Sequence, residues 1–113
     1  MEFFCYHRDR QGSMDLRRGM LERHWGYMDH FADRMVPRGP TFADDGTLTG
    51  SVHIVDLPDV TAARAFAFNE PGYQAGVYRD VMLRRWRNVG AQDVGLREQA
   101  SWARALSRAG SRR

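Results

Sequence analysis

The beginning of the chain has the pattern of a short β-strand. Four consecutive apolar or aromatic side chains run from Phe3 to Tyr6, and a polar segment over residues 9–12 follows them. A short apolar run that ends at turn residues is typical of a strand. Because the four apolar side chains are consecutive rather than alternating, we expect both faces of a strand over Glu2–Arg8 to be buried.

The next segment has the spacing of an amphipathic helix. Ser13 is a candidate N-cap, and Asp15 in the first turn complements the positive end of the helix dipole. The residues that then recur at helical spacing are Leu16, Met20, His24, Tyr27, Phe31 and Met35. The pattern predicts one long helix that ends before Pro37, because proline disfavours the helical conformation of the residue before it.

Two turn sequences in the middle of the chain predict a β-hairpin. They are Gly-Pro at residues 39–40 and Asp-Asp-Gly at residues 44–46, and they flank residues 41–43. We expect residues 41–43 to pair with a strand over residues 47–56, which is rich in Thr, Val and Ile. Alternation along this strand places Val52 and Ile54 on one side and Ser51, His53 and Val55 on the other.

A second helix and a last strand follow the hairpin. Pro58 can open the helix, since its missing N–H would have no helical partner there. The expected apolar face consists of Val60, Ala63, Phe66 and Ala67, and the helix ends near Asn69. After a glycine turn over residues 72–76, residues 77–86 have the pattern of a strand. Arginines at positions 79, 84, 85 and 87 suit an edge strand, where charge resists aggregation.

The order of the predicted elements is strand, helix, strand, strand, helix, strand. It matches the ferredoxin-like α+β arrangement, βαββαβ, in which an antiparallel sheet has both helices on one face. The other face would expose a large apolar patch, so we expect a dimer that covers it. The side chains from which this patch would be drawn are Phe3, Phe4, Tyr6, Val52, Val55 and Met82.

The composition changes near the end of the chain. We interpret residues 1–89 as one domain and residues 90–113 as a C-terminal extension. The spacing of Leu96, Ala100, Ala103 and Leu106, with Trp102 nearby, predicts an extra amphipathic helix there. The basic end over residues 110–113 is expected to be disordered.

Composition narrows the classes of function. A length of 113 residues fits one domain and excludes a multidomain enzyme. We find neither an apolar segment long enough for a membrane span nor a signal peptide, so we expect a cytoplasmic protein. The single cysteine, Cys5, forms neither an internal disulfide nor a cysteine-based metal site. All 17 basic residues are arginine, which excludes lysine Schiff-base and P-loop chemistry.

Two residues are candidates for acid–base chemistry. His24 falls on the apolar stripe of the first helix, where it is either a core histidine with satisfied hydrogen bonds or a pocket residue that transfers protons. Glu70, between a helix end and a glycine turn, either caps the backbone or orients an imidazole. His30 lies six residues after His24 and therefore on another helix face, which argues against a metal site.

Several segments together resemble the YciI-like (YCII-related) family of dimeric α+β barrel proteins. They are the aromatic first strand, the helix with His24, Gly-Pro at 39–40, Gly-Ser at 50–51, Glu-Pro at 70–71 and Ala-Gly-Val-Tyr at 75–78, and they span about residues 2–87. The family's usual features are a histidine on the first helix and an aspartate in an Asp-Pro motif, proposed as a catalytic pair. The resemblance maps this pair onto His24 and Glu70, with glutamate in place of aspartate. It also implies a homodimeric barrel, with a pocket near His24 between the first helix and the sheet.

The preferred hypothesis that follows is a cofactor-independent lyase, isomerase or cyclase. In this hypothesis His24 transfers a proton on a small aromatic or polyketide-like substrate, and Glu70 holds the imidazole. Relatives implied by the resemblance include a dehydrochlorinase that acts on a chlorinated hydroxyquinol. Ser51 is a candidate donor to a substrate oxygen, and Tyr73 or Tyr78 could line the pocket or protonate the ligand. No metal or other cofactor is expected.

Two alternatives stay open. In the first, the protein is a non-catalytic small-molecule-binding or accessory protein of the same fold, and His24 and Glu70 merely satisfy each other's hydrogen bonds. In the second, it binds nucleic acid through the arginine-rich segment around Trp86. The net charge of +3 is small and no nucleic-acid-binding motif is recognisable, so the sequence argues against this second alternative.

Overall fold

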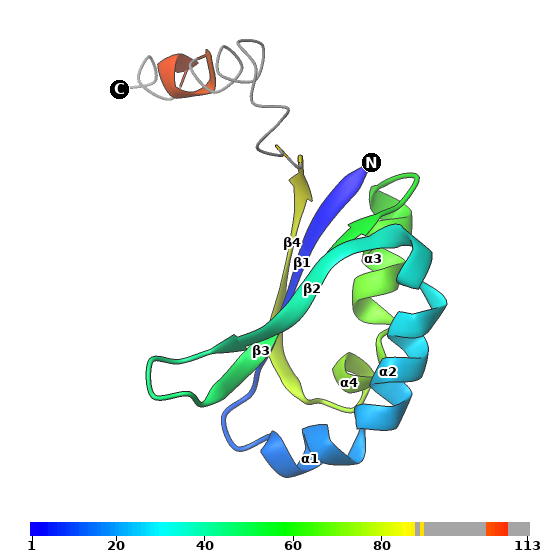
Figure 1. Ribbon diagram of the computed structural model, residues 1–113, viewed down its shortest axis with the longest axis vertical. Coiled ribbons are helices and arrows are strands. Elements are labelled where there is room, and N and C mark those ends of the chain that lie inside the picture. Colours follow the sequence, from blue (N-terminus) through cyan, green and yellow to red (C-terminus); the bar gives the residue numbers. More distant parts are fainter. Residues whose placement is uncertain (88, 90–103, 109–113) are drawn as a thin grey trace.

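The computed structural model describes residues 1–87, 89 and 104–108. A four-stranded antiparallel sheet has the order β2-β3-β1-β4 and carries the helices on one face (Figure 1). The strands are β1 (Glu2–Asp9), β2 (Met35–Phe42), β3 (Leu48–Asp56) and β4 (Tyr78–Trp86). The helices are α1 (Met14–Gly19), α2 (Leu21–His30), the 3-10 helix η1 (Ala32–Arg34), α3 (Val60–Phe68) and α4 (Pro71–Gln74). The ferredoxin-like α+β fold predicted from the sequence is confirmed.

The pairing of the strands assigns each side chain to one face of the sheet. In the two central strands, the side chains under the helices are Phe3, Cys5 and His7 of β1 and their partners Val55, His53 and Ser51 of β3. Phe4 and Tyr6 point to the opposite face and are half-buried, because successive side chains of a strand alternate between faces. The expected burial of both faces of β1 is therefore wrong for the single chain. The expectation that Phe3 and Val55 belong to the apolar patch on the other face is also wrong, because both lie under the helices.

The predicted long first helix is divided in two and ends early. Met20, at φ −102° and ψ −2°, separates α1 from α2. Ser13 stands at the N-cap of α1, but its side chain makes no capping hydrogen bond. Helix α2 ends at His30, and Met35, the last residue of the predicted stripe, begins β2 instead. Pro37 accounts for this strand, since it drives the preceding residue to extended backbone and is tolerated in an edge strand.

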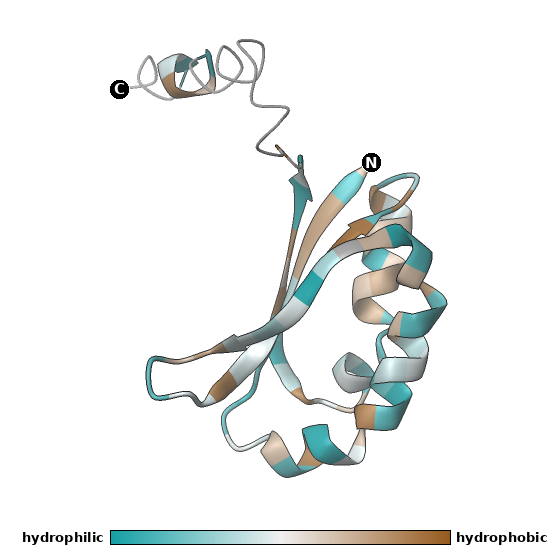
Figure 2. Cartoon of the chain, in the orientation of Figure 1, coloured by the Kyte–Doolittle hydropathy of each residue, from teal (hydrophilic) through white to brown (hydrophobic). Residues whose placement is uncertain are grey.

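The hydrophobic core lies between the sheet and the helices α2 and α3. Its buried members are Phe3, Cys5, Met28, Val55, Leu57, Ala63, Phe66 and Ala67. The predicted face of α3 is confirmed at Ala63, Phe66 and Ala67, whereas Val60 is exposed. Helix α2 buries only Met28, a residue outside its predicted stripe. Figure 2 shows the same contrast, with α3 largely apolar and α2 mostly hydrophilic. A polar α2 is suited to line a cleft rather than to fill the core.

The remaining elements differ from the predictions mainly in their bounds. Residues 39–40, predicted as a turn, lie inside β2, and the predicted glycine turn over residues 72–76 overlaps the short helix α4. Helix α3 begins after Asp59, whose carboxylate accepts a hydrogen bond from the Ala62 N–H at 2.8 Å, and not at Pro58. Strand β4 is an edge of the sheet, as its arginines predict. Residues 104–108 are helical, and the rest of the predicted C-terminal helix and of the basic end lies outside the described residues. In the part of the chain that the structure describes, every helix is too short or too polar to span a bilayer.

Candidate functional site

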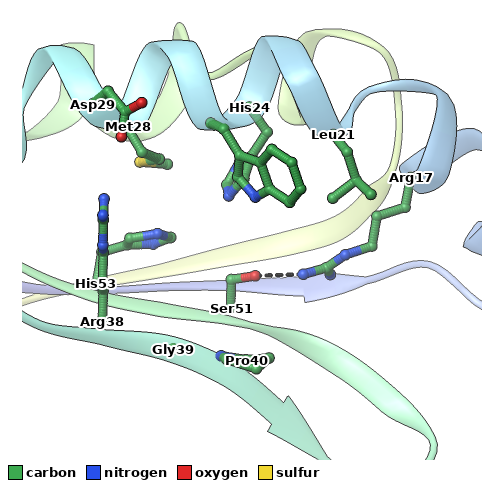
Figure 3. Close-up of a pocket in the computed structure, with 11 residues that line it drawn as sticks. Arg17, Leu21, His24, Met28, Asp29, Arg38, Gly39, Pro40, Ser51 and His53 are labelled. Atoms are coloured by element: carbon green, nitrogen blue, oxygen red, sulfur yellow. Dashed lines mark hydrogen bonds between the residues drawn. The ribbon is translucent and has the colours of Figure 1, made fainter.

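A cleft of about 530 Å³ opens between α2 and the sheet. In Figure 3, His24 and Met28 point from α2 toward the sheet, and Ser51 and His53 of β3 face them from the other side. Arg17 of α1 closes one end. The fold therefore brings polar side chains from four separate elements, α1, α2, β2 and β3, to the walls of one cleft.

His24, on the wall of this cleft, is paired with Glu70. Its Nδ1 lies 2.7 Å from Oε1 of Glu70, and the Glu70 side chain is fully buried whereas 16% of the His24 side chain is exposed. An ionised carboxylate only accepts hydrogen bonds, so Nδ1 carries the proton and Nε2 is left as an acceptor. The arrangement can take up a proton at Nε2 and stabilise the resulting imidazolium with the buried carboxylate.

Glu70 is held rigidly at the N-cap of α4. Its Oε2 accepts a hydrogen bond from the Tyr73 N–H at 2.8 Å. Burial raises the pKa of Glu70, but hydrogen bonds from His24 and from the N–H groups of Gly72 and Tyr73 outweigh it, so the net pKa lies below its usual value. Burial, the Glu70 charge and a hydrogen bond to Glu70 raise the pKa of Tyr78 above its usual range. Because its net pKa is lowered, the Glu70 carboxylate stays ionised inside the protein.

Close packing around Glu70 requires a glycine at position 72. A Cβ there would lie 2.9 Å from the Tyr78 hydroxyl and 3.0 Å from Oε2 of Glu70. We expect Gly72→Ala to lower the free energy of unfolding by about 1–3 kcal/mol, because overpacking displaces both groups. Gly26→Ala in α2 is the matched control: its Cβ would meet nothing within 4 Å, and alanine favours a helix over glycine by about 0.5–1 kcal/mol. Chemical denaturation measures both variants, and a Gly72→Ala protein as stable as wild type would contradict the packing.

A second, nearly buried ion pair lies at the end of the cleft. Nη1 of Arg17 donates to both carboxylate oxygens of Asp9, at 2.5 and 2.7 Å, and Nη2 donates to Oγ of Ser51 at 2.6 Å. The Arg17 and Asp9 side chains are only 13% and 8% exposed. Because Ser51 accepts from Arg17, its own hydroxyl proton points elsewhere. Ser51 therefore keeps a donor for a ligand oxygen.

Two further histidines lie under the helices. Nε2 of His7 is 2.8 Å from the carbonyl oxygen of Ala67, and the His7 and Tyr78 ring centroids are 4.6 Å apart. The ring centroid of His53 is 5.8 Å from that of His24, and His53 borders the cleft. Burial is the main cause that lowers the pKa of both residues, to about 3 for His53. Both imidazoles are therefore uncharged at neutral pH.

The residues expected from the sequence do not all lie at the cleft. His24 and Ser51 line it, and Glu70 lies behind His24. Tyr78 borders a void of about 10 Å³ behind His24 rather than the cleft itself, because its hydroxyl is used by Glu70. The Tyr73 side chain is 37% exposed and packs on the end of α3. The structure thus places neither tyrosine among the residues that line the cleft.

Sequence reasoning missed several residues of this site, among them Asp9, Arg17 and Trp25. Asp9 was assigned to a turn, and Arg17 and the half-exposed Trp25 of the cleft were not singled out. One signal was available for Arg17, which precedes His24 by seven residues, or about two helical turns. For Asp9 the signal was weaker, because a carboxylate at a strand end is more often solvated than buried.

The sequence and the fold of this chain are similar to those of known proteins. The model of the YCII-related domain matches residues 1–87. The chain belongs to the YCII-related family. Among solved structures, this YCII-related chain is similar to the 5-chloro-2-hydroxyhydroquinone dehydrochlorinase of Burkholderia phenoliruptrix AC1100, solved as a complex with 2,5-dihydroxybenzoquinone. The two share 28% sequence identity and a TM-score of 0.73, over 82% of this chain and 99% of that chain. No curated protein matches the sequence significantly.

The glutamate in this YCII-related chain still reaches its histidine. The longer arm of Glu70 could have displaced the carboxylate from the position of an aspartate, but Oε1 lies at hydrogen-bonding distance from His24. The cap on Tyr73 and the absence of a side chain at Gly72 leave room for this conformation. A glutamate at position 70 therefore makes the contact with His24 that the sequence analysis expected of the pair.

Proposed function

We propose that the protein is a cofactor-independent lyase or isomerase in which His24 transfers a proton on a small, oxygenated aromatic or quinone-like substrate. The observation that carries the proposal is the 2.7 Å contact between Nδ1 of His24 and the buried Glu70 at the wall of a cleft. A histidine oriented by a buried carboxylate is a common arrangement for general acid–base catalysis at neutral pH.

In the proposed reaction, Nε2 of His24 removes a proton from an acidic carbon or hydroxyl group of the substrate. When the proton comes from a ring hydroxyl, the O–H electron pair forms a carbonyl C=O bond, and a ring π pair moves to the neighbouring carbon, which takes up the proton from the imidazolium. In a lyase this carbon bears a leaving group such as chloride, and loss of a second hydroxyl proton then expels chloride with its bonding electrons and leaves a quinone. In an isomerase the reaction ends when the proton has been returned to the different carbon. Either route balances without an oxidant. General acid–base assistance contributes about 10²- to 10⁴-fold, so the substrate proton must already be acidic.

The polar end of the cleft supports the same proposal. Negative charge develops on a ring oxygen when the proton leaves, and a preorganised donor stabilises it. The hydroxyl of Ser51 has its proton free for this purpose, since Arg17 donates to its oxygen. The guanidinium of Arg17 adds positive charge nearby. The dehydrochlorinase to which the chain is similar has a substrate of this type, a chlorinated hydroquinone.

The open face of the sheet supports the proposal of a dimer. Phe4 and Tyr6 of β1 lie there, with Met82 and Trp86 of β4, which are 38% and 42% exposed. Phe4 stacks on Trp86 at a centroid distance of 6.1 Å, so the apolar side chains form a continuous patch. Such patches on a small protein mark an interaction surface. A second copy that covers this patch would give the two-sheet barrel expected from the sequence.

The assay that tests the proposed function uses two compounds. The wild-type protein is mixed with 5-chloro-2-hydroxyhydroquinone, and chloride release is followed together with quinone absorbance. Binding of 2,5-dihydroxybenzoquinone is measured by calorimetry. We expect saturable binding and enzyme-dependent chloride release. Binding without conversion would instead support the non-catalytic ligand-binding alternative, and neither binding nor conversion at millimolar concentration would contradict the proposed substrate class.

A further inference from the structure

His53 is a buried histidine that the proposed reaction does not use. Its side chain projects from β3 into the space beneath α2 (Figure 3), it is 3% exposed, and it borders the cleft. Its Nδ1 has no hydrogen-bond partner among the residues that the structure describes. An unpaired buried polar atom destabilises the folded state, so a purely structural residue is rarely found in this situation.

His7 shows what a structural histidine looks like in the same fold. It lies on the neighbouring strand and is also fully buried, but its Nε2 is 2.8 Å from the carbonyl oxygen of Ala67. It does not border the cleft beneath α2. The two histidines thus differ in the two properties that matter for a ligand, the unpaired nitrogen and the position on a cleft wall.

The charge state of His53 suits contact with a ligand oxygen. Burial, followed by repulsion from His24 and His7, lowers its pKa to about 3. The charge of Glu70 opposes this shift, whereas Arg38 adds to it. A neutral imidazole has one donor and one acceptor nitrogen and does not compete with His24 for a proton. It can hydrogen bond to a hydroxyl or a carbonyl oxygen without destabilising an imidazolium at His24.

We propose that His53 is the second polar anchor of the cleft and hydrogen bonds to an oxygen on the substrate ring. This inference rests on the proposed function and narrows its substrate class. Ser51 and His53 lie two residues apart on the same face of β3, which separates their Cα atoms by about 6.6 Å. One oxygen held by Ser51 and another by His53 require a small ring with oxygens on opposite sides. Hydroquinones and hydroxyquinones have this pattern, whereas phenols with one oxygen do not.

The test compares substitutions at the two buried histidines. Binding of 2,5-dihydroxybenzoquinone and the thermal midpoint Tm of the ligand-free protein are measured for wild type, His53→Leu, His53→Asn and His7→Leu. We expect His53→Leu to weaken binding about tenfold or more, because a buried hydrogen bond to the ligand is lost. The Tm of this variant should stay the same or rise, because the unpaired nitrogen is removed. His53→Asn restores a polar group and should recover part of the affinity.

His7→Leu is the control, because it leaves the Ala67 carbonyl without its partner and should lower Tm. A His53→Leu protein that binds as tightly as wild type, or whose Tm falls as far as that of His7→Leu, would overturn the inference. So would a wild-type protein that does not bind the quinone. If His53→Leu weakens binding while His24→Gln retains full turnover, the proposed role of His24 fails and the anchor stands. If instead His24→Gln loses turnover while His53→Leu binds the quinone as tightly as wild type, only the proposed role of His53 fails.

Discussion

A His24→Gln variant should lose about 10²- to 10⁴-fold of the chloride-release rate with 5-chloro-2-hydroxyhydroquinone. Glutamine keeps a polar side chain of similar length on the cleft wall, but its amide does not take up a proton at neutral pH. The variant has no imidazole for the buried Glu70 to orient. Among the described residues that line the cleft, no other histidine is hydrogen-bonded to a carboxylate and could replace His24. The affinity for 2,5-dihydroxybenzoquinone should change much less than the rate, since proton transfer is not needed for binding.

Two variants make this result interpretable. His30→Gln changes the exposed histidine at the end of the same helix and should keep the wild-type rate. Glu70→Gln still accepts the hydrogen bond from His24 but lacks the charge that stabilises the imidazolium, so its rate should fall between those of wild type and His24→Gln. Equal rates for His24→Gln and wild type would remove the histidine from the mechanism.

Arg17→Met should lower the free energy of unfolding by about 3–5 kcal/mol, the largest loss of stability that we expect from one substitution here. Methionine has a similar length and fills the space of the arginine stem, but it leaves the Asp9 carboxylate without a counterion. That carboxylate is 8% exposed and would have to be buried as an unpaired charge or take up a proton. Ser51 would also lose its donor from Arg17. Urea denaturation at pH 7 measures the effect.

A neighbouring ion pair supplies the control for Arg17. Arg18 and Asp15 lie on the same helix at 3.7 Å, but their side chains are 71% and 98% exposed. Exposed pairs contribute little, so Arg18→Met should unfold at nearly the wild-type urea concentration. Combining Arg17→Met with Asp9→Asn should recover much of the lost stability, because the buried charge is removed with its partner. If Arg17→Met costs no more than Arg18→Met, the buried pair is not a stabilising contact.

Most of the fold could be predicted from local patterns, and the errors have a common cause. Alternation along β3 placed Ser51 and His53 on the same face, and the spacing of α3 identified its buried alanines. The stripe of the first helix was misleading, because Met35 continues its period but belongs to a strand. Periodicity shows which residues share a face, but it does not show where a chain leaves a helix to join a sheet edge.

The candidate site was predictable only in part, because local patterns do not show which distant residues meet in the fold. His24 stood out because a titratable residue on an apolar stripe is unusual, and Glu70 because it follows a helix end. Their contact joins residues 46 positions apart, and only the packing of α4 on α2 creates it. Arg17 and Asp9 could not be recognised as a pair, since nothing in the sequence distinguishes a buried aspartate from a solvated one. The orphaned nitrogen of His53 is a property of its surroundings and has no signature in the sequence.

The two edges of the sheet limit how molecules of this protein can associate. Strand β2 forms one edge and contains Pro37 and Pro40, which have no N–H to donate to an added strand. Strand β4 forms the other edge and carries arginines at positions 79, 84 and 85, all exposed, whose charges repel a like neighbour. Strand addition at either edge, which would lead to ribbons or fibrils, is therefore disfavoured. The proposed dimer would instead form through the open face of the sheet and would leave the cleft beneath α2 outside the interface.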